Sequence, residues 1–410
     1  MPTDTPDFLI IGAGVIGLAM ALEARKRHPS AAITVVDKES IPGQHASGRN
    51  SGVLHAGFYY TGDSLKARFT LEGNRAWTDY CLERGLQINQ CGKLVVASSE
   101  AELAGLDLLQ ERGATNGVPL ERISEAQAQA IEPRVKTCGE ALWSPLTASV
   151  DPAEVMASLT QDVRDAGIHI ETGAPWQMTE GERVKIGGRW YEPGYLINAA
   201  GLYADQIARA YGYSQDHVIL PFKGLYLKSD EPAGAVKTNI YPVPDLQNPF
   251  LGVHFTVTVS GKVKIGPTAI PAFWREHYRG LDGFHAGECL DIVSRELALF
   301  WRNPFGFRRL ALGELMKYRR ARMAQLARAM LSGVEARHYR QWGPPGIRAQ
   351  LYDVKQGRLE MDFRFEGDHR SLHVLNAVSP GFTCALPFSS YLFDQIDRLR
   401  SGVDEKHTGA

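Results

Sequence analysis

The sequence predicts an α/β fold in which a parallel-sheet domain is interrupted by a second, α+β domain built on an antiparallel sheet. Three observations support this prediction. The chain opens as strand, glycine-rich turn, helix and strand over residues 8–37, and helix and strand signals alternate again over 151–201. Residues 253–266 instead alternate apolar and polar side chains around a Ser260-Gly261 turn, which is typical of an antiparallel hairpin. With 410 residues, 44% of them hydrophobic, the chain is long enough for two domains.

The opening segment carries a dinucleotide-binding fingerprint. An apolar strand runs into Gly12, Gly14 and Gly17 and then into a helix. The first glycine permits a tight turn, the second lets a pyrophosphate approach the backbone, and the third lets the helix pack on the strand. The helix N-terminus then faces the phosphate charge. A second apolar strand ends at Asp37, twenty residues after Gly17, where a carboxylate can accept hydrogen bonds from ribose hydroxyls and disfavours a 2′-phosphate. The sequence therefore predicts a Rossmann-like domain.

Composition excludes several classes of partner. Lys and Arg total 45 against 46 Asp and Glu, so no global positive field favours nucleic acid. No apolar run reaches the length of a membrane span, and the N-terminal residues 1–7 lack the apolar core of a signal peptide, so we expect a cytoplasmic location. The cysteines are odd in number and have no metal-ligand spacing, which predicts reduced thiols and no metal site. They are Cys81, Cys91, Cys138, Cys289 and Cys384.

The remaining elements follow from periodicity and turn signals. We expect helices within 64–84, 101–131, 152–166, 286–330 and 380–400, and strands at 92–97, 168–172, 184–186, 195–198, 348–352, 359–365 and 371–376. Ser379 and Pro380 are interpreted as the N-cap and first residue of the last helix. The expected domains are 1–90, 146–220 and 341–410 for nucleotide binding, and 91–145 and 221–340 for the substrate.

Eight segments in order, spread over nearly the whole chain, carry a family resemblance. They are residues 48–60, 62–67, 90–97, 198–201, 241–245, 249–256, 346–350 and 373–377. In these segments the sequence resembles the FAD-dependent oxidoreductases of the D-amino-acid-oxidase type, and within them the L-2-hydroxyglutarate dehydrogenases and oxidases. The chain departs from that pattern at Lys223 and Leu225, where the family usually has arginine and glutamate, and at the bulky segment 379–388. These departures suggest a pocket for another 2-hydroxy acid.

The resemblance implies FAD as the cofactor. With one nucleotide fingerprint and no second glycine-rich site for NAD(P)H, the electrons are expected to come from the substrate and to leave to oxygen, a quinone or a protein carrier. The last helix is expected to direct its positive end toward the reduced flavin, and His45 and His55 stay open as covalent attachment points. The expected FAD-binding residues are Gly12, Gly14, Val15, Ile16, Gly17, Asp37, Lys38, Ser47, Asn50, Ser51, Gly52, Val53, Ala200, Gly201, Ser379, Gly381, Phe382 and Thr383.

Oxidation of a hydroxyl group needs a base within hydrogen-bond reach, and imidazole is the usual choice. His55 is the first candidate, as base or as organiser of the hydride site; the alternative is a histidine that only packs beside the flavin. His254 is the rival base, unless its face of the strand is solvated. Arg348 is expected to clamp a substrate carboxylate as a bidentate fork, or else to close an ion pair at the domain boundary. Lys223, Tyr226, Tyr241 and Thr383 are the further substrate-binding candidates.

The favoured function is oxidation of a 2-hydroxy acid, L-2-hydroxyglutarate above others, to the 2-oxo acid. The alternatives are an amine oxidase of the glycine or sarcosine oxidase type and a flavin-binding protein without turnover. Residues 302–340 hold ten basic residues against only Glu314 and Glu335, beside apolar residues at helical spacing. This stretch predicts either peripheral contact with the inner face of a membrane or a solvated helix face. The oligomeric state stays open.

Overall fold

The computed structural model describes residues 4–244, 251–402 and 407–408, and the chain divides into two compact units. Unit 1 comprises Met1–Arg49, Pro152–Pro221 and Arg348–Ala410, and unit 2 comprises Asn50–Asp151 and Phe222–Ile347. Asp245, Pro249 and Phe250, which belong to the segments of family resemblance, lie outside the described residues.

Unit 1 is built on a seven-stranded sheet with the order β25-β23-β24-β13-β1-β2-β9. The five strands from β24 to β9 are parallel to their neighbours, and β23 and β25 add antiparallel strands at one edge. The bounds are β1 (Phe8–Ile11), β2 (Ile33–Val36), β9 (His169–Glu171), β13 (Tyr195–Asn198), β23 (Arg364–Gly367), β24 (Ser371–Asn376) and β25 (His407–Thr408). The parallel order confirms the predicted α/β class.

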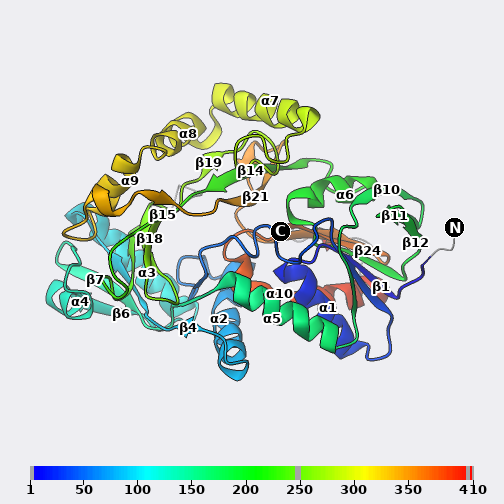
Figure 1. The fold of residues 1–410 in the computed structure, drawn as a ribbon, viewed down its shortest axis with the longest axis horizontal. Helices are drawn as coiled ribbons and strands as arrows, with labels where there is room; N and C mark the ends of the chain where they lie inside the picture. The colour runs from blue at the N-terminus through cyan, green and yellow to red at the C-terminus, as the bar shows by residue number, and fades with distance from the viewer. Residues whose placement is uncertain (1–3, 245–250, 403–406, 409–410) are drawn as a thin grey trace. The chain divides into compact units, whose positions relative to one another are not determined.

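Alternating side chains of β1 pack on opposite faces of this sheet, as the twofold period of a strand requires. The Phe8 ring lies 5.8 Å from the Phe393 ring of α10. Leu9 and Ile11 join a cluster with Ile207 of α6 and with β11. On the first side, α1 (Val15–Arg27) packs against α5 (Pro152–Asp165) and α10 (Gly381–Arg400), as Figure 1 shows. On the second side lie α6 (Ala204–Ala210) and the sheet of β10 (Trp176–Glu180), β11 (Arg183–Ile186) and β12 (Arg189–Tyr191).

Unit 2 is built on an eight-stranded sheet with the order β20-β15-β18-β17-β16-β5-β7-β6, in which β5 and β16 form a parallel pair and the other recorded pairs are antiparallel. The bounds are β5 (Lys93–Val96), β6 (Glu121–Ser124), β7 (Glu140–Ser144), β15 (Leu227–Lys228), β16 (Asn239–Pro242), β17 (His254–Val257), β18 (Val263–Gly266) and β20 (Gln341–Trp342). Its apolar face includes Leu94, Ile240 and Phe255, and it packs against α4 (Glu125–Ile131) and α9 (Arg320–Ala327). The β17–β18 hairpin around Gly261 confirms the predicted antiparallel element.

The other elements of unit 2 are α2 (Leu65–Glu83), α3 (Leu103–Thr115), α7 (Ala286–Arg302), α8 (Phe307–Met316), β3 (Val53–Leu54), β4 (Ile88–Asn89), β8 (Ala148–Val150) and β19 (Ile270–Pro271). Two strands, β14 (His217–Gly224) and β21 (Gly346–Asp353), run from one unit into the other, and β22 (Arg358–Leu359) pairs with the end of β21 in unit 1. Short 3₁₀ turns lie at Glu100–Glu102, Gly201–Tyr203, Pro304–Gly306 and Ala336–His338. Within the described part of the chain, no helix combines the length and apolarity that crossing a membrane requires.

Residues 50–90 belong to unit 2, whereas the sequence analysis assigned them to the nucleotide-binding domain. The reason is pairing that is distant in sequence. Strand β8 pairs with both β3 and β4, and Asn74 of α2 donates hydrogen bonds of 3.0 Å to the carbonyls of Leu54 and Leu146. These contacts join α2 and β3 to the segment that precedes Asp151.

Two local predictions were wrong. The expected strand 359–365 is interrupted between β22 and β23, because the Asn376 amide binds the carbonyls of Glu360 and Asp362 in place of a strand ladder. Ser379 does not cap the last helix. The Gly381 amide bonds back to the Val378 carbonyl in a turn, so α10 begins at Gly381 with Pro380 as its N-cap and with no side-chain cap among the described residues.

The Asn74 bridge predicts a stability effect. Replacing Asn74 with Ala leaves two buried carbonyl groups without their donor, and we expect it to lower the free energy of unfolding by about 1–3 kcal/mol. The measurement is urea unfolding of the holoenzyme, followed by circular dichroism. Gln129→Ala, at an exposed amide on α4, is the control and should change little; equal stability of N74A and the wild type would contradict the assigned bridge.

Candidate functional site

The glycine-rich turn of unit 1 brings three stretches of backbone into close contact. Gly12 has φ +108°, and a Cβ built on it would lie 2.4 Å from the Ala199 carbonyl oxygen. A Cβ on Gly17 would lie 1.8 Å from the Gly12 carbonyl oxygen. Both positions therefore require glycine. At Gly14 the only contact of an added Cβ would be the Ser47 Oγ, at 3.0 Å, so this glycine is not required by the fold itself.

Polar groups around this turn fit the phosphate and ribose of a dinucleotide. Ser47 Oγ accepts a hydrogen bond of 2.9 Å from the Val15 amide. The Asp37 carboxylate follows β2 and accepts hydrogen bonds from the amides of Ala13 (2.6 Å) and Glu39 (2.9 Å). The N-cap residue of α1, Gly14, supplies no side-chain cap, and the first turn of the helix holds no acidic residue. The positive end of α1 is therefore suited to an anion.

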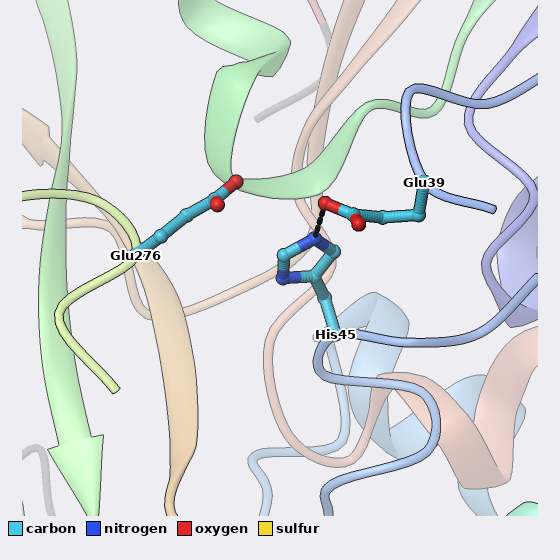
Figure 2. A group of neighbouring side chains, drawn as sticks. All are labelled: Glu39, His45 and Glu276. Atoms are coloured by element: carbon cyan, nitrogen blue, oxygen red, sulfur yellow. Dashed lines mark hydrogen bonds and ion pairs between the residues drawn. The ribbon is translucent and has the colours of Figure 1, made fainter. Parts of the chain in front are cut away.

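The carboxylate of Glu39, two residues after Asp37, is paired locally. His45 Nε2 lies 2.9 Å from Glu39 Oε1 (Figure 2), and Lys38 contacts the same carboxylate oxygen. Against burial, which raises it, the Lys38 ammonium and the His45 imidazole lower the pKa of the Glu39 carboxyl. Because Glu39 is engaged in these ion pairs, Asp37 is the better candidate for the ribose.

The other expected FAD residues of unit 1 lie on segments that meet α1. The Asn198 side chain accepts from the Ala200 amide and donates to the Ala204 carbonyl, which holds the loop of Ala200 and Gly201 beside Gly12. Gly381, Phe382 and Thr383 form the first turn of α10, which packs against α1. The open backbone at Gly14 fits the pyrophosphate of FAD, and the Asp37 carboxylate fits its ribose. The roles of the individual residues stay predictions.

In unit 2, the face of the eight-stranded sheet opposite the cluster of Leu94, Ile240 and Phe255 is also buried, and it holds polar side chains among apolar ones such as Val95 and Leu142. Lys93 pairs with Asn239 in register, and Ile240 pairs with Phe255, so Lys93, Tyr241 and His254 share this face. All three are at most 3% exposed. The sequence is compatible with a His254 side chain on either a pocket or a solvated face of its strand. Because His254 is buried, the solvated alternative is wrong.

Lys93 is enclosed by aromatic rings. Its Nζ lies 4.5 Å from the ring centre of Phe58, 4.6 Å from that of Tyr59 and 4.7 Å from that of Tyr241. Among the described residues it has no hydrogen-bond partner. Burial lowers its pKa to about 7. Cation–π contacts compensate part of the lost hydration, but an ammonium group this deeply buried also favours a bound anion.

His254 is neutral and has a defined tautomer. Its ring stacks on Tyr241 with 3.8 Å between centroids, and Nδ1 lies 2.9 Å from the Gly252 carbonyl, which can only accept. Nδ1 therefore carries the proton, which leaves Nε2 as an acceptor. Burial lowers the pKa of His254 to about 3, with Lys93 and Lys264 contributing and the Gly252 carbonyl opposing.

His55 follows β3 and is 7% exposed. Burial first, then the charge of Lys93 and the His254 imidazole, hold the pKa of His55 well below its usual value. The three groups are therefore electrostatically coupled. Both candidate bases identified from the sequence belong to one buried cluster in unit 2, and both are uncharged at neutral pH.

A second, partly buried lysine extends this face. Lys264 pairs in register with Thr256, its Nζ donates a hydrogen bond of 3.0 Å to the Ser51 carbonyl, and it lies 4.8 Å from the ring centre of Tyr226. Burial and then Lys228 lower the pKa of Lys264 to about 8, against Asp151, which raises it. Lys223, by contrast, lies on β14 opposite Ile270, outside the eight-stranded sheet, and burial lowers its pKa to about 8.

The expected site residues are distributed over both units. Arg348 lies half-buried on β21 and belongs to unit 1. The FAD candidates up to Ser47 and from Ala200 onward also belong to unit 1. The candidates Asn50, Ser51, Gly52 and Val53 belong to unit 2, where the Asn50 side chain accepts from the Gly52 amide at 2.8 Å. Lys93 and Lys264 are not among the site residues predicted from the sequence. The available signal is a lysine next to apolar strand residues, since lysine is seldom buried without a partner.

The open space at Gly14 predicts that a side chain there weakens FAD binding while the protein stays folded. Replacing Gly14 with Ala puts a methyl group where the pyrophosphate is expected, while its only contact in the fold is the Ser47 hydroxyl. We expect a folded protein whose FAD affinity falls at least about tenfold, the equivalent of 1.4 kcal/mol. The flavin-to-protein absorbance ratio after dialysis measures it. Gly313→Ala, at a helix position with open space, is the matched control; full flavin content in G14A would contradict the assignment.

Comparison with known proteins agrees with this geometry. The family model "FAD dependent oxidoreductase" (DAO) matches residues 7–394. The chain is 36% identical over 426 residues to the mitochondrial L-2-hydroxyglutarate dehydrogenase of Homo sapiens, which covers 97% of this chain and 89% of the human protein. It is 35% identical over 407 residues to the L-2-hydroxyglutarate dehydrogenase of Escherichia coli strain K12, covering 96% and 93% of the two chains.

Solved structures agree on the fold. L-alpha-glycerophosphate oxidase from Mycoplasma pneumoniae, determined with FAD bound, superposes with a TM-score of 0.75 at 20% identity over 99% of this chain and 97% of that one. Glycine oxidase from Geobacillus kaustophilus superposes with a TM-score of 0.70 at 18% identity, over 97% and 95%. Taken with the glycine turn, the Asp37 carboxylate and the buried polar sheet face, these matches show that the chain belongs to the DAO family of FAD-dependent oxidoreductases and uses FAD as its cofactor.

Proposed function

We propose that this protein oxidises L-2-hydroxyglutarate to 2-oxoglutarate, with FAD held by unit 1 and the substrate held by the polar face of unit 2. The observation that carries the proposal is the pair of lysines on that face, one fully buried and one partly buried. Lys93 is fully buried without a hydrogen-bond partner among the described residues, and Lys264 lies on the same sheet face. Two cationic groups in a desolvated setting favour a dianion such as a hydroxy dicarboxylate. The similarity to the two dehydrogenases supports the same substrate.

In this proposal the chain's own groups bind the acid and move one proton. Lys93 and Lys264 hold substrate carboxylates, and Arg348, Lys223, Tyr226 and Thr383 are further binding candidates. His55 accepts the proton of the C2 hydroxyl, with His254 Nε2 as the rival acceptor. Both imidazoles are uncharged before the substrate binds, and a carboxylate nearby raises their pKa, which makes them stronger bases.

FAD, when bound, supplies the acceptor for the hydride that leaves C2. The electrons then pass to oxygen, a quinone or a protein carrier. The identity of the proposed electron acceptor does not depend on any of the residue contacts described above.

The amine-oxidase alternative fits this face less well. Its substrate carries an ammonium group beside the carboxylate, and that ammonium would lie close to the charges of Lys93 and Lys264. Like charges in a desolvated setting repel strongly. A hydroxyl group in the same place carries no charge, so the electrostatics favour the hydroxy acid.

The test is anaerobic reduction of the purified holoenzyme with a panel of acids. We expect L-2-hydroxyglutarate to bleach the flavin absorbance and to yield 2-oxoglutarate, with sarcosine and glycine inactive and L-lactate much slower. Reoxidation with oxygen or a quinone analogue then identifies the acceptor. Bleaching by sarcosine alone would establish the amine oxidase, and no bleaching by any acid would establish a flavin protein without turnover.

The variant Lys93→Met distinguishes the loss of a carboxylate contact from general damage to the enzyme. Loss of one charged hydrogen-bond donor should lower kcat/KM for L-2-hydroxyglutarate by about 10- to 100-fold and affect L-lactate far less. Lys93 loses its proton as the pH rises through about 7, so the wild-type preference for the dianion should decline above that pH, and K93M should show no such decline. Lys26→Met, at an exposed position of α1, is the control. An equal loss for both acids would count against a carboxylate contact.

We also propose that α7 and α8 dock peripherally on an anionic membrane. Leu290, Leu297 and Trp301 of α7 are 73%, 53% and 75% exposed, and Leu312 and Leu315 of α8 are also exposed. The apolar stripe expected from the sequence is only partly external, because Met323 and Met330 are buried. Exposed arginines lie beside these residues in the chain, namely Arg302, Arg308, Arg309, Arg319, Arg320, Arg322 and Arg328. Apolar side chains flanked by guanidinium groups complement anionic lipid.

Sedimentation with liposomes tests this docking. The holoenzyme should pellet with phosphatidylserine-containing vesicles at low salt, less so at 0.5 M salt, and not with phosphatidylcholine alone. The double variant Leu297→Ser, Trp301→Ser should stay in the supernatant, whereas Met361→Ser, at another exposed apolar residue, should pellet normally. A wild-type protein that stays in solution with anionic vesicles would refute the docking.

A further inference from the structure

A buried imidazole in unit 1 faces two carboxylates that the proposed reaction does not use. His217 begins β14, Asp353 ends β21, and Glu360 follows β22. His217 Nε2 lies 3.8 Å from Asp353 Oδ2 and 3.7 Å from Glu360 Oε1. One ligand atom from each of the three residues lies within 4.8 Å of the others.

The imidazole nitrogen has no hydrogen-bond partner. His217 is 6% exposed, and its Nε2 lies beyond hydrogen-bond distance of both carboxylates and has no other acceptor or donor among the described residues. A buried polar atom without a partner is costly and calls for a ligand.

The backbone around each ligand is held in place. Arg209 Nη2 and Ser214 Oγ donate to the His217 carbonyl. The Gln356 amide donates to Asp353 Oδ1 at 2.8 Å, which leaves Oδ2 for the His217 side. The Gln350 and Asn376 amides donate to the Glu360 carbonyl at 2.7 and 3.1 Å. Such support fixes the backbone that carries His217 and Glu360, and it orients the Asp353 carboxylate, before any ion binds.

The donor set suits a cation, because two carboxylates lie beside a single imidazole. Arg364 Nη2 pairs with Glu366 Oε1 at 3.1 Å, so this guanidinium is already engaged and does not neutralise the pair of carboxylates.

We propose that His217, Asp353 and Glu360 bind one divalent transition-metal ion of the Zn²⁺ or Mn²⁺ class. Two ligand atoms on a tetrahedral ion at about 2.1 Å lie about 3.4 Å apart, so the two separations between His217 and the carboxylates need to close by only about 0.3–0.4 Å. The two carboxylate oxygens lie within 4.8 Å of each other. An imidazole with two carboxylates suits these ions better than Mg²⁺ or Ca²⁺, which prefer oxygen ligands alone. Three protein ligands leave one position for water at the partly exposed side of Glu360.

Such an ion would join the start of β14 to the β21–β22 hairpin. Both long strands continue from this point into unit 2. The ion would therefore stabilise unit 1 at the place where the chain leaves and re-enters it, and this role does not depend on the proposed reaction.

The experiment measures metal binding by the flavin-loaded protein, independently of turnover. The holoenzyme is treated with a chelator, exchanged into buffer with Mn²⁺, and its metal content is measured by mass spectrometry and by the loss of the free Mn²⁺ electron paramagnetic resonance signal. Mn²⁺ is the first probe because it binds thiols poorly and so avoids the free cysteines. Zn²⁺ and Ca²⁺ are run in parallel. We expect one equivalent of Mn²⁺ or Zn²⁺ per chain, no comparable binding of Ca²⁺, and a rise in the thermal unfolding midpoint.

Variants locate the ion. His217→Ala and Glu360→Gln should each lose the equivalent of metal and the rise in midpoint. E360Q keeps the size of a partly exposed side chain, so it serves if H217A fails to fold. His338→Ala removes an exposed imidazole that lies 2.6 Å from Asp230, and it should bind metal as the wild type does. No stoichiometric metal in the wild type would overturn the proposal, as would binding that persists in both H217A and E360Q.

Discussion

The structure of unit 1 depends on two close contacts of backbone with backbone. The Gly12 carbonyl lies against α1 at Gly17, and the Ala199 carbonyl lies against Gly12, at distances that leave no room for a Cβ at either glycine. These contacts bring β1, α1 and the loop after β13 together, and they place the positive end of α1 beside Asp37 and Ser47. The surface that fits a pyrophosphate is thus formed mainly by backbone.

Unit 2 is organised by a sheet with two unlike buried faces. One face carries the apolar cluster that includes Leu94, Ile240 and Phe255. The other buries Lys93, His254 and their neighbours, and burial depresses the pKa of both groups. Burying such groups opposes folding. Perturbed ionisable groups of this kind gather at functional sites, because the same desolvation that destabilises them strengthens their interaction with a bound charge. The apolar face supplies the stabilisation that offsets this cost.

Local sequence patterns predicted the elements correctly where the whole pattern lies within one strand, helix or hairpin, as at β1, β13, α5 and the β17–β18 hairpin. It failed where a distant side chain decides the outcome. Asn376 interrupts the expected strand at Glu360, and Asn74 ties residues 50–90 to unit 2. The same contrast between local patterns and distant contacts holds for the functional site. The glycine turn and Asp37 are readable because their spacing is local, whereas the burial of His254 depends on what packs over its strand, and an alternating pattern leaves that face undetermined.

By itself the sequence determined the fold class, the FAD cofactor, and His55 and His254 as the histidines to consider, because glycine spacing, strand period and family motifs are properties of short contiguous segments. Only the tertiary structure decided that Lys93 and His254 share one buried face, since β5 and β17 meet only through β16. It alone brought His217 to Asp353 and Glu360, which lie more than 130 residues further along the chain. Long-range strand pairing sets such neighbours, and no local pattern encodes the register in which distant strands meet.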